Sequence, residues 1–262
     1  MKAALHVQTG LRNGISWLKK SYASTPFKVA NITENKTDHT LQLMLMSSSP
    51  GILDGDEFKL TFELEAGSSL HVQTQSYQRL YNMKQQAAQQ MNVLLQPGSH
   101  FYFLPHPTVP HENSVFKSVN NFYLSDGCSL LFGEILTCGR KLSGETFLFK
   151  SYHNITRVFI NGKLAIKENL LMKPAAISVG SIGQLEGFTH QASLMYVAET
   201  ADLKQLIADI IHLLEAENEI DFGVTAAPVN GMIVRILGNK AEQLHDCLKK
   251  IGLITQHSTH NT

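Results

Sequence analysis

The chain has 262 residues, of which 43% are hydrophobic and 17% charged, so a packed globular core is expected and wholesale disorder is excluded. Its 22 basic and 22 acidic residues give a formal net charge of zero, which argues against a nucleic-acid-binding protein because such proteins carry a basic excess. The sequence shows neither a signal-peptide pattern nor an apolar run long enough to cross a membrane, and its three cysteines form no paired framework. We therefore expect a cytoplasmic protein with no nucleic-acid or membrane partner.

Alternating hydrophobic and polar residues, which are typical of strands with one buried face, dominate the first three quarters of the chain. The clearest case is 58–65, FKLTFELE, where every second residue is apolar. Asn161 and Gly162 lie between two such segments and predict a tight hairpin turn, since both central residues of that turn need positive φ. Further strands are expected at 41–46, 70–74, 91–95, 101–104, 129–136, 146–152, 155–160 and 164–167.

A weak internal repeat runs through this region. Three segments share a turn glycine, a small or polar residue and then a strand, and their glycines are Gly67, Gly98 and Gly127. The spacings of 31 and 29 residues are nearly constant, which is typical of coils or sheet layers stacked on one another. The alternative is a chance recurrence in a turn-rich β protein.

The last quarter changes character. Apolar residues at helical spacing predict a helix over 201–217, and a second helix over 240–251 is expected to end before Gly252, a suitable residue for a helix C-terminus. The final six residues, HSTHNT, are expected to be frayed. Two short strands are expected between the helices, at 222–225 and 232–237.

These elements predict a mainly β fold. We expect a layered, β-rich core over 1–198 and, over 199–262, an α/β element of the same domain that carries the two C-terminal helices. The sequence contains no linker rich in proline or serine that would separate two domains.

Carboxylates are the strongest candidates for chemistry. Glu134 lies inside an apolar strand, and Glu145 follows the turn after that strand. Burying an unpaired carboxylate costs several kcal/mol or forces it to take up a proton, so each needs a partner or a function. Together with Asp56 they could act as acid and base, or as weak oxygen ligands of a metal ion. The alternative is that Arg79, Arg140 or backbone N–H groups satisfy each one.

Other site chemistries have little support. His106 and His111 lie in a three-proline loop, but the sequence has neither His-x-His nor His-Glu-x-x-His spacing. A Gly-x-Ser-x-Gly nucleophile turn and the glycine-rich nucleotide-binding patterns are also absent from the sequence. The segment 49–56 looks like a phosphate loop but leads into a strand, so we interpret it as a turn capped by Asp56. We expect no permanently bound cofactor.

Four segments in a fixed order carry a family signature: PGILDGD (50–56), QTQSYQRLYN (73–82), LPHPTVPH (104–111) and GEILTCGRKLSGE (133–145). Over roughly 25–173, their order and spacing resemble the urease accessory protein family UreD, called UreH in some organisms. Asp54, Arg79 and Gly133 stand where that family usually has glycine, lysine and tryptophan. The residues that match partner-binding or structural positions of the family are Arg79, Tyr81, Pro105, Pro110, Arg140 and Gly144.

The resemblance implies a non-enzymatic scaffold and metallochaperone with a helicoid, layered β-rich fold and two helices. Such a protein docks on apo-urease, binds UreF and with it UreG, and helps to deliver nickel to the urease active site within a higher-order complex. On this resemblance, Glu134 and Glu145 are candidates for a transient nickel path, Asp56 is a weaker one, and Arg140 orients them.

The sequence leaves two other functional interpretations open. One is a β-helical or sandwich hydrolase or lyase that uses Glu134 and Glu145 as acid and base, although Trp17 is the only tryptophan available as a sugar platform. The other is a cupin-like metal-binding module, which would need a cluster of histidines inside a barrel.

Overall fold

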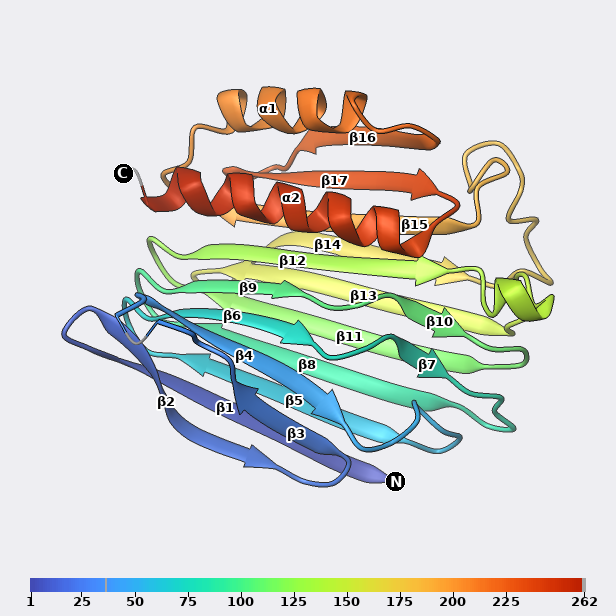
Figure 1. The fold of residues 1–262 in the computed structure, drawn as a ribbon, viewed down its shortest axis with the longest axis horizontal. Coiled ribbons are helices and arrows are strands. Elements are labelled where there is room, and N and C mark those ends of the chain that lie inside the picture. The colour runs from blue at the N-terminus through green and yellow to red at the C-terminus, as the bar shows by residue number, and fades with distance from the viewer. Residues whose placement is uncertain (36, 261–262) are drawn as a thin grey trace.

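The structure, a computed structural model, describes residues 1–35 and 37–260, with side chains described up to Gln256. Strands account for 51% of the residues and helices for 13%, and the two α-helices lie in the C-terminal part of the chain (Figure 1). This confirms the expected mainly β class with two C-terminal helices. None of the described helices combines the length and apolar character needed to cross a membrane.

Two sheets lie face to face, and helices cover the outer face of one of them (Figure 1). The seven-stranded sheet has the order β14 (Lys163–Met172), β13 (Ser151–Ile160), β11 (Val115–Leu124), β8 (Ala87–Leu95), β5 (Glu57–Leu64), β1 (Lys2–Arg12) and β2 (Ile15–Ala23).

The other sheet is ten-stranded and carries the helices. Its main path is β16 (Ile220–Ala226), β17 (Gly231–Gly238), β15 (His190–Ala198), β12 (Ser129–Thr137), β9 (His100–Leu104), β6 (Ser69–Thr74), β4 (Thr40–Ser47) and β3 (Phe27–Asn31). Two short strands, β7 (Gln78–Leu80) and β10 (Thr108–Pro110), pair beside this path. The helices are α1 (Leu203–Glu215), α2 (Ala241–His260) and the single-turn 3₁₀ helix η1 (Lys141–Ser143).

From β4 to β13 the chain winds between the two sheets, so successive strands within each sheet are parallel. The three turn glycines lie directly over one another: a Cβ on Gly98 would be 4.0 Å from the Cα of Gly67, and one on Gly127 would be 3.7 Å from the Cα of Gly98. All three have φ between 66° and 70°, in the left-handed region that favours glycine. The near-30-residue repeat is therefore a real structural repeat, in which each coil stacks its turn on the preceding one.

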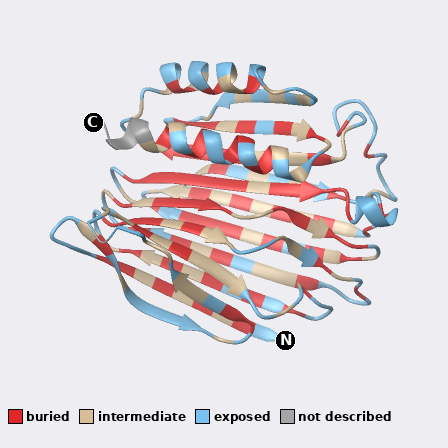
Figure 2. Cartoon of the chain, in the orientation of Figure 1, coloured by how far each residue is buried: buried red, intermediate tan, exposed pale blue. Residues whose placement is uncertain are grey.

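The alternation of β12 divides the protein into two cores. Leu130, Phe132 and Leu136 point between the two sheets, whereas Leu131 and Ile135 point toward the helices. Figure 2 shows β12 as an almost continuously buried strand at the centre of the molecule. The C-terminal elements belong to the same body, because β17 extends the ten-stranded sheet by pairing with β15.

Several expected elements are present, and two differ. The hairpin turn at Asn161 and Gly162 is confirmed, with φ of 50° and 77°. The strand expected over 146–152 is wrong in its first part, since Phe147 has a φ of 56° and β13 begins only at Ser151.

The end of the second helix is also different from the expectation. α2 continues through Gly252 to His260, so this glycine does not end it, and residues 261–262 of the expected frayed tail lie outside the described part of the chain. A Cβ at Gly252 would lie 3.0 Å from Cδ1 of Leu104 on β9. The glycine thus lets the helix approach the sheet closely.

Candidate functional site

Glu134 lies on β12 between two inward-facing apolar residues, Phe132 and Leu136, and its side chain points into the space between the sheets. Its carboxylate receives two amide donors from the opposite sheet. The distances are 2.5 Å from Nδ2 of Asn154 to Oε2 and 3.4 Å from Nδ2 of Asn120 to Oε1. No arginine or lysine pairs with Glu134 among the ion pairs of residues 1–35 and 37–260.

The two asparagines belong to a buried polar cluster on the inner faces of β11 and β13. Asn120 Nδ2 also lies 3.1 Å from both Asn154 Oδ1 and Thr156 Oγ1, and Ser118 donates to Asn154. Register explains the cluster, because Ser118 pairs with Asn154 and Asn120 with Thr156 across the two strands. Apolar side chains at these inner positions would avoid the desolvation of polar groups, so the cluster is a candidate for function rather than for stability.

Burial controls the protonation of Glu134. Loss of solvent raises the pKa of this carboxyl to about 8, against the lowering effect of the bonds from Asn154 and Asn120. The side chain retains partial exposure because internal cavities reach it, while the carboxylate itself lies deep between the sheets. Near neutral pH it can therefore exist with or without its proton, and a cation that binds there competes with that proton.

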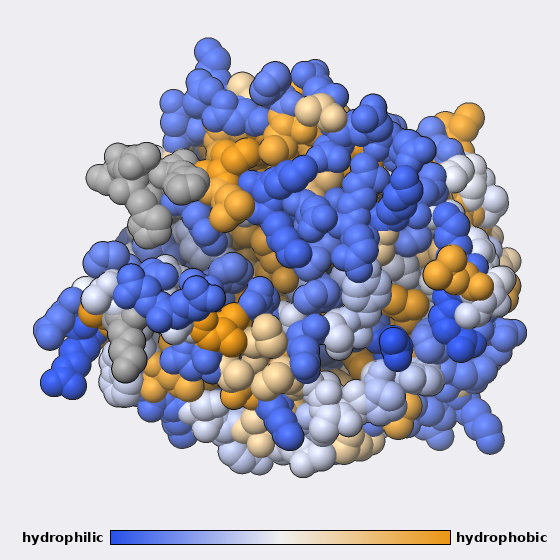
Figure 3. Space-filling view, viewed as in Figure 1, coloured by the Kyte–Doolittle hydropathy of each residue, from blue (hydrophilic) through white to orange (hydrophobic). Residues whose placement is uncertain are grey.

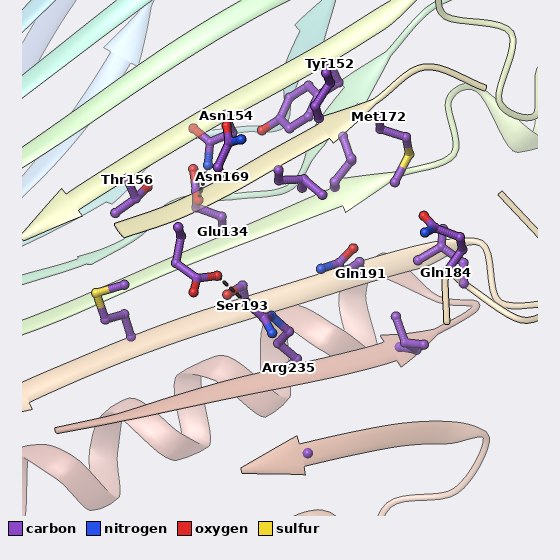
Figure 4. A pocket seen from close by; sticks show the side chains of 18 of the residues that line it. Glu134, Tyr152, Asn154, Thr156, Asn169, Met172, Gln184, Gln191, Ser193 and Arg235 are labelled. Atoms are coloured by element: carbon purple, nitrogen blue, oxygen red, sulfur yellow. Dashed lines mark hydrogen bonds and ion pairs between the residues drawn. The ribbon is translucent and has the colours of Figure 1, made fainter. Parts of the chain in front are cut away.

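A cavity of about 540 Å³ extends from Glu134 toward β14, β15, β16 and β17. Polar and apolar side chains both line this cavity. In Figure 4, Asn154 and Thr156 lie beside Glu134, and Gln184, Gln191, Ser193 and Arg235 are the labelled polar residues farther along. At its rim, Arg235 on β17 forms an ion pair with Glu168 on β14 and thereby bridges the two sheets.

A smaller cavity of about 140 Å³ lies on the other side of Glu134 and reaches toward Tyr77 and His106. Phe132, Glu134 and Tyr152 line both cavities, so the two meet at this carboxylate.

Polar side chains continue from the junction into the smaller cavity. The hydroxyl of Tyr152 lies near the side chains of Thr108 and Ser118. Thr108 Oγ1 in turn donates to Gln78 Oε1 at 3.3 Å, and Gln78 Nε2 donates to Gln89 Oε1 at 3.1 Å. A continuous row of oxygen-bearing groups therefore runs from the small cavity to Glu134.

Glu145 has a different environment. It accepts hydrogen bonds from both the Nε and Nη2 atoms of Arg140, and its Oε2 lies 3.2 Å from the backbone N of Glu112. The Arg140 guanidinium is the main cause that holds the pKa of the Glu145 carboxyl below its usual range. Thus Arg140 does pair with one of the two predicted carboxylates, whereas amides hold the other. Glu134 lines both cavities, whereas Glu145 is not among the described residues that line either of them.

Asp56 also has structural partners. Its Oδ1 lies 2.8 Å from the amino group of Met1 and its Oδ2 accepts a 2.8 Å bond from the backbone N of Leu53. It caps the 49–56 turn, as expected from the sequence. Among the described residues it lines neither of the two cavities.

The family-signature residues hold the loops at one end of the sheets. Gly51 approaches so closely that an added Cβ would lie 2.4 Å from the backbone O of Arg79, and Tyr81 packs on His111 with ring centroids 4.7 Å apart. Pro105 and Pro110 bound the loop that contains β10, and Gly144, with φ of 80°, ends η1. These positions shape the region around Arg140 and Glu145.

The histidines and cysteines do not gather into a ligand set. His106 accepts or donates a 3.0 Å bond with Thr74 and packs against His245, with the rings tilted by 43° and their centroids 4.6 Å apart. Burial lowers the pKa of both rings, that of His245 to about 4. The three cysteines are free and buried. Across the described residues, no group of three or more His, Cys, Asp or Glu side chains is arranged to hold a metal ion.

The amide cluster is the part of the site that sequence reasoning missed. Asn120 and Asn154 occupy positions where the alternation of β11 and β13 places inward-facing residues, next to Phe122 and Tyr152. A polar residue in the apolar register of a strand is the signal that indicates such a site.

Comparison with known proteins gives a consistent result. The family described as "UreD urease accessory protein" matches residues 1–262. A urease accessory protein UreD of Flavobacterium johnsoniae is 50% identical over 94% of this chain and 90% of its own length. The UreD proteins of Acetivibrio thermocellus (33% identical, 95% of each chain) and Actinobacillus pleuropneumoniae serotype 3 (30% identical, 97% of each chain) are also similar.

Proposed function

Because this chain belongs to the UreD family of urease accessory proteins, we propose that it is a non-enzymatic, cytoplasmic scaffold that helps to deliver nickel to apo-urease. In this role it docks on apo-urease, binds UreF and through it UreG, and binds nickel only in transit, with no permanent cofactor.

The observation that carries the proposal is the meeting of two cavities at Glu134. The carboxylate lacks a basic partner among the described ion pairs, and its two oxygens accept hydrogen bonds from the amide N–H groups of Asn120 and Asn154. Further side chains with hydroxyl and amide oxygens line the two cavities around it, and such neutral oxygens together with a carboxylate suit a divalent cation. A single carboxylate with neutral oxygens binds such an ion weakly, and weak binding favours release. Proton uptake by Glu134, whose pKa burial has raised, further favours release.

The remaining predicted path residues have separate parts in the proposal. Glu145, oriented by Arg140, and Asp56 stay candidates for a transient contact, while their bonds favour a role in holding the loops. Glu134 is therefore the residue on which the nickel path depends.

The enzyme alternative has less support. An acid and base pair requires two carboxylates facing one substrate site. Glu145 is instead engaged by Arg140 and the backbone N–H of Glu112, and it is not among the described residues that line either cavity with Glu134.

The test is nickel activation of urease in cells that co-express urease, UreF, UreG and this chain. Glu134→Leu, alone or with Glu145→Leu, should abolish activation while the variants remain in the complex. Glu63→Leu, on the outer face of β5, is the matched control and should activate normally. Full activation by the Glu134→Leu, Glu145→Leu double variant would overturn the nickel path.

Partner binding is tested separately by co-expression with UreF, followed by pull-down and size-exclusion chromatography. A stable complex is expected. A chain that is monodisperse by itself and forms no complex with UreF would contradict the scaffold role.

A further inference from the structure

The larger cavity ends at an edge of the two sheets, where an ion pair crosses from one sheet to the other. Arg235 on β17 pairs there with Glu168 on β14, the edge strand of the seven-stranded sheet. Among the described residues that line this cavity, Arg235 is the only basic one, and it stands against the carboxyl groups of Glu134, Glu168 and Asp221. The lining is therefore acidic on balance, which favours a cation over an anion inside the cavity.

A row of residues leads across the ten-stranded sheet from Glu134 to this edge. Glu134 on β12 lies opposite Ser193 on β15, and Ser193 lies opposite Arg235 on β17 (Figure 4). The next residue in the row is Gly223 on β16, where an added Cβ would meet no atom within 4 Å. The row therefore runs from the buried carboxylate to open space.

A second row, on the seven-stranded sheet, faces the first. Asn120 on β11 lies opposite Thr156 on β13, and Thr156 lies opposite Glu168 on β14. Asn120 donates to both Glu134 and Thr156, so the inner ends of the two rows are in contact. The ion pair of Glu168 with Arg235 joins their outer ends. The two rows thus form a short polar passage, with Glu134 at its inner end and the ion pair at its mouth.

The ion pair can open without disturbing the fold. The side chain of Arg235 is 54% exposed and that of Glu168 is 30% exposed, and exposed ion pairs contribute little to stability. Arg235 alternates along β17 with Val234 and Ile236, which are buried under the helices. The helices therefore cover the other face of this strand, and Figure 3 shows mainly hydrophilic side chains over α1 and α2. The guanidinium of Arg235 can turn into solvent while Glu168 stays at the mouth.

Glu168 also acts on the buried carboxyl through the cavity. Burial is the main cause of the raised pKa of Glu134, and the negative charge of Glu168 raises it further. The two carboxylates therefore repel each other, and a divalent cation near them would relieve this repulsion. Arg235 neutralises Glu168 when no cation is bound, so a cation and the guanidinium compete for the same carboxylate.

We infer that the Arg235–Glu168 ion pair is the gate of the larger cavity. A divalent cation that moves between Glu134 and the mouth takes the place of Arg235 on Glu168, and Arg235 returns when the cation has left. The inference rests on the proposed function and adds to it Glu168 as a second oxygen ligand and Arg235 as the group that displaces the ion. A guanidinium that competes for a ligand weakens cation binding, which suits an ion in transit.

The alternative is an ion pair that only joins the edges of the two sheets. Replacing either partner would then have the same effect on the protein. A gate predicts opposite effects on cation binding, because one residue holds the ion and the other competes with it.

The experiment measures binding of nickel(II), supplied as the chloride, to this chain purified with UreF, by equilibrium dialysis. Only the binding that Glu134→Gln removes is counted, so that surface histidines do not contribute. Arg235→Ala should bind nickel roughly fivefold more tightly, whereas Glu168→Gln should bind it roughly tenfold more weakly. The double variant should match Glu168→Gln alone, because the arginine acts only through this carboxylate. Lys167→Ala removes an equal charge from an exposed neighbouring position of β14 and should bind nickel as the wild type does.

Release of nickel is the second readout. Transfer of bound nickel to an excess of a chelator, followed by stopped-flow absorbance, should be slower in Arg235→Ala than in the wild type. Arg235→Lys keeps the positive charge and should restore most of the wild-type rate. Thermal unfolding checks that each variant is folded.

Equal weakening of nickel binding by Arg235→Ala and Glu168→Gln would overturn the gate, since that is the result expected of a bridge between the sheets. Unchanged binding in both variants, with binding lost in Glu134→Gln, would also overturn it but would leave the proposed nickel path standing. Nickel binding that Glu134→Gln does not reduce would overturn the path and the gate together. The two proposals are therefore separately testable.

Discussion

Replacing Glu134 by glutamine should make the protein more stable near neutral pH while it impairs nickel delivery. A carboxyl whose pKa is higher in the folded chain than in the unfolded chain holds its proton more tightly when folded. Its contribution to stability is therefore complete below pH 4.5, the ordinary pKa, and is lost as the pH rises through about 8. Glutamine does not titrate, so Glu134→Gln lacks this loss.

The size of the effect follows from the two pKa values. At about 1.4 kcal/mol for each tenfold change in proton affinity, the difference between 4.5 and about 8 corresponds to roughly 5 kcal/mol above pH 9 and roughly 3 kcal/mol at pH 7. Glutamine accepts from Asn154 but presents an amide donor where Asn120 donates, which costs about 1 kcal/mol. The variant should be less stable by about 1 kcal/mol near pH 4 and more stable by about 2 kcal/mol at pH 7.

Urea denaturation of both proteins from pH 4 to pH 9 measures this crossing. Only the difference between the free energies of unfolding of the two proteins is used, so that the contribution of histidine titration, which is the same in both, cancels. A difference that does not vary with pH, or a variant less stable than the wild type at pH 8, would refute the assignment of a desolvated carboxyl. Greater stability with lower urease activation is the expected result for a residue that serves function at the expense of folding.

Three further changes test the structural parts of the account. Arg140→Ala should lower stability only slightly, because the Arg140 side chain is half exposed. The loss of stability should disappear as the pH falls through the lowered pKa of Glu145, so urea denaturation should show a loss at pH 7 and none at pH 3. Equal losses at both pH values would contradict the ion pair. Gly133→Ala places a Cβ 2.6 Å from Cδ2 of Leu104 on β9 and 3.1 Å from Cδ1 of Leu248 on α2. It should cost about 1–3 kcal/mol in urea denaturation, so a neutral variant would show that β9 and α2 pack more loosely against β12. Gly98→Ala should cost about 1–2 kcal/mol in the same assay because φ is 69° there, and no loss would argue against the stacked turn.

Much of the fold was predictable because period-two alternation directly reports a half-buried strand. It located β5, β6 and β9, and the glycine spacing indicated the stacked coils. The strands β11 and β15 escaped because their buried positions include polar or small residues, such as Asn120 in β11 and Ala192 in β15. Alternation alone gives no clear signal where the inner face is itself polar.

The candidate site was only half predictable for the same reason. A carboxylate in an apolar strand identified Glu134 from sequence alone, since that residue type at that position requires compensation. Its partners lie 14 and 20 residues away in sequence and meet it only because β11 and β13 face β12 across the core. Arg140, the nearest basic residue in sequence, was one possible partner together with Arg79 and backbone N–H groups, but it lies beyond the end of β12 and pairs with Glu145.

In the proposed function, nickel passes Glu134 on its way between the two cavities. Crystals of this chain with UreF, soaked in a nickel salt at pH 8.5 and measured at the nickel absorption edge, would show whether the ion binds there. We predict an anomalous peak within coordination distance of the Glu134 carboxylate, which is lost in Glu134→Gln. Nickel peaks found only on surface histidines, with none between the two cavities, would contradict the account.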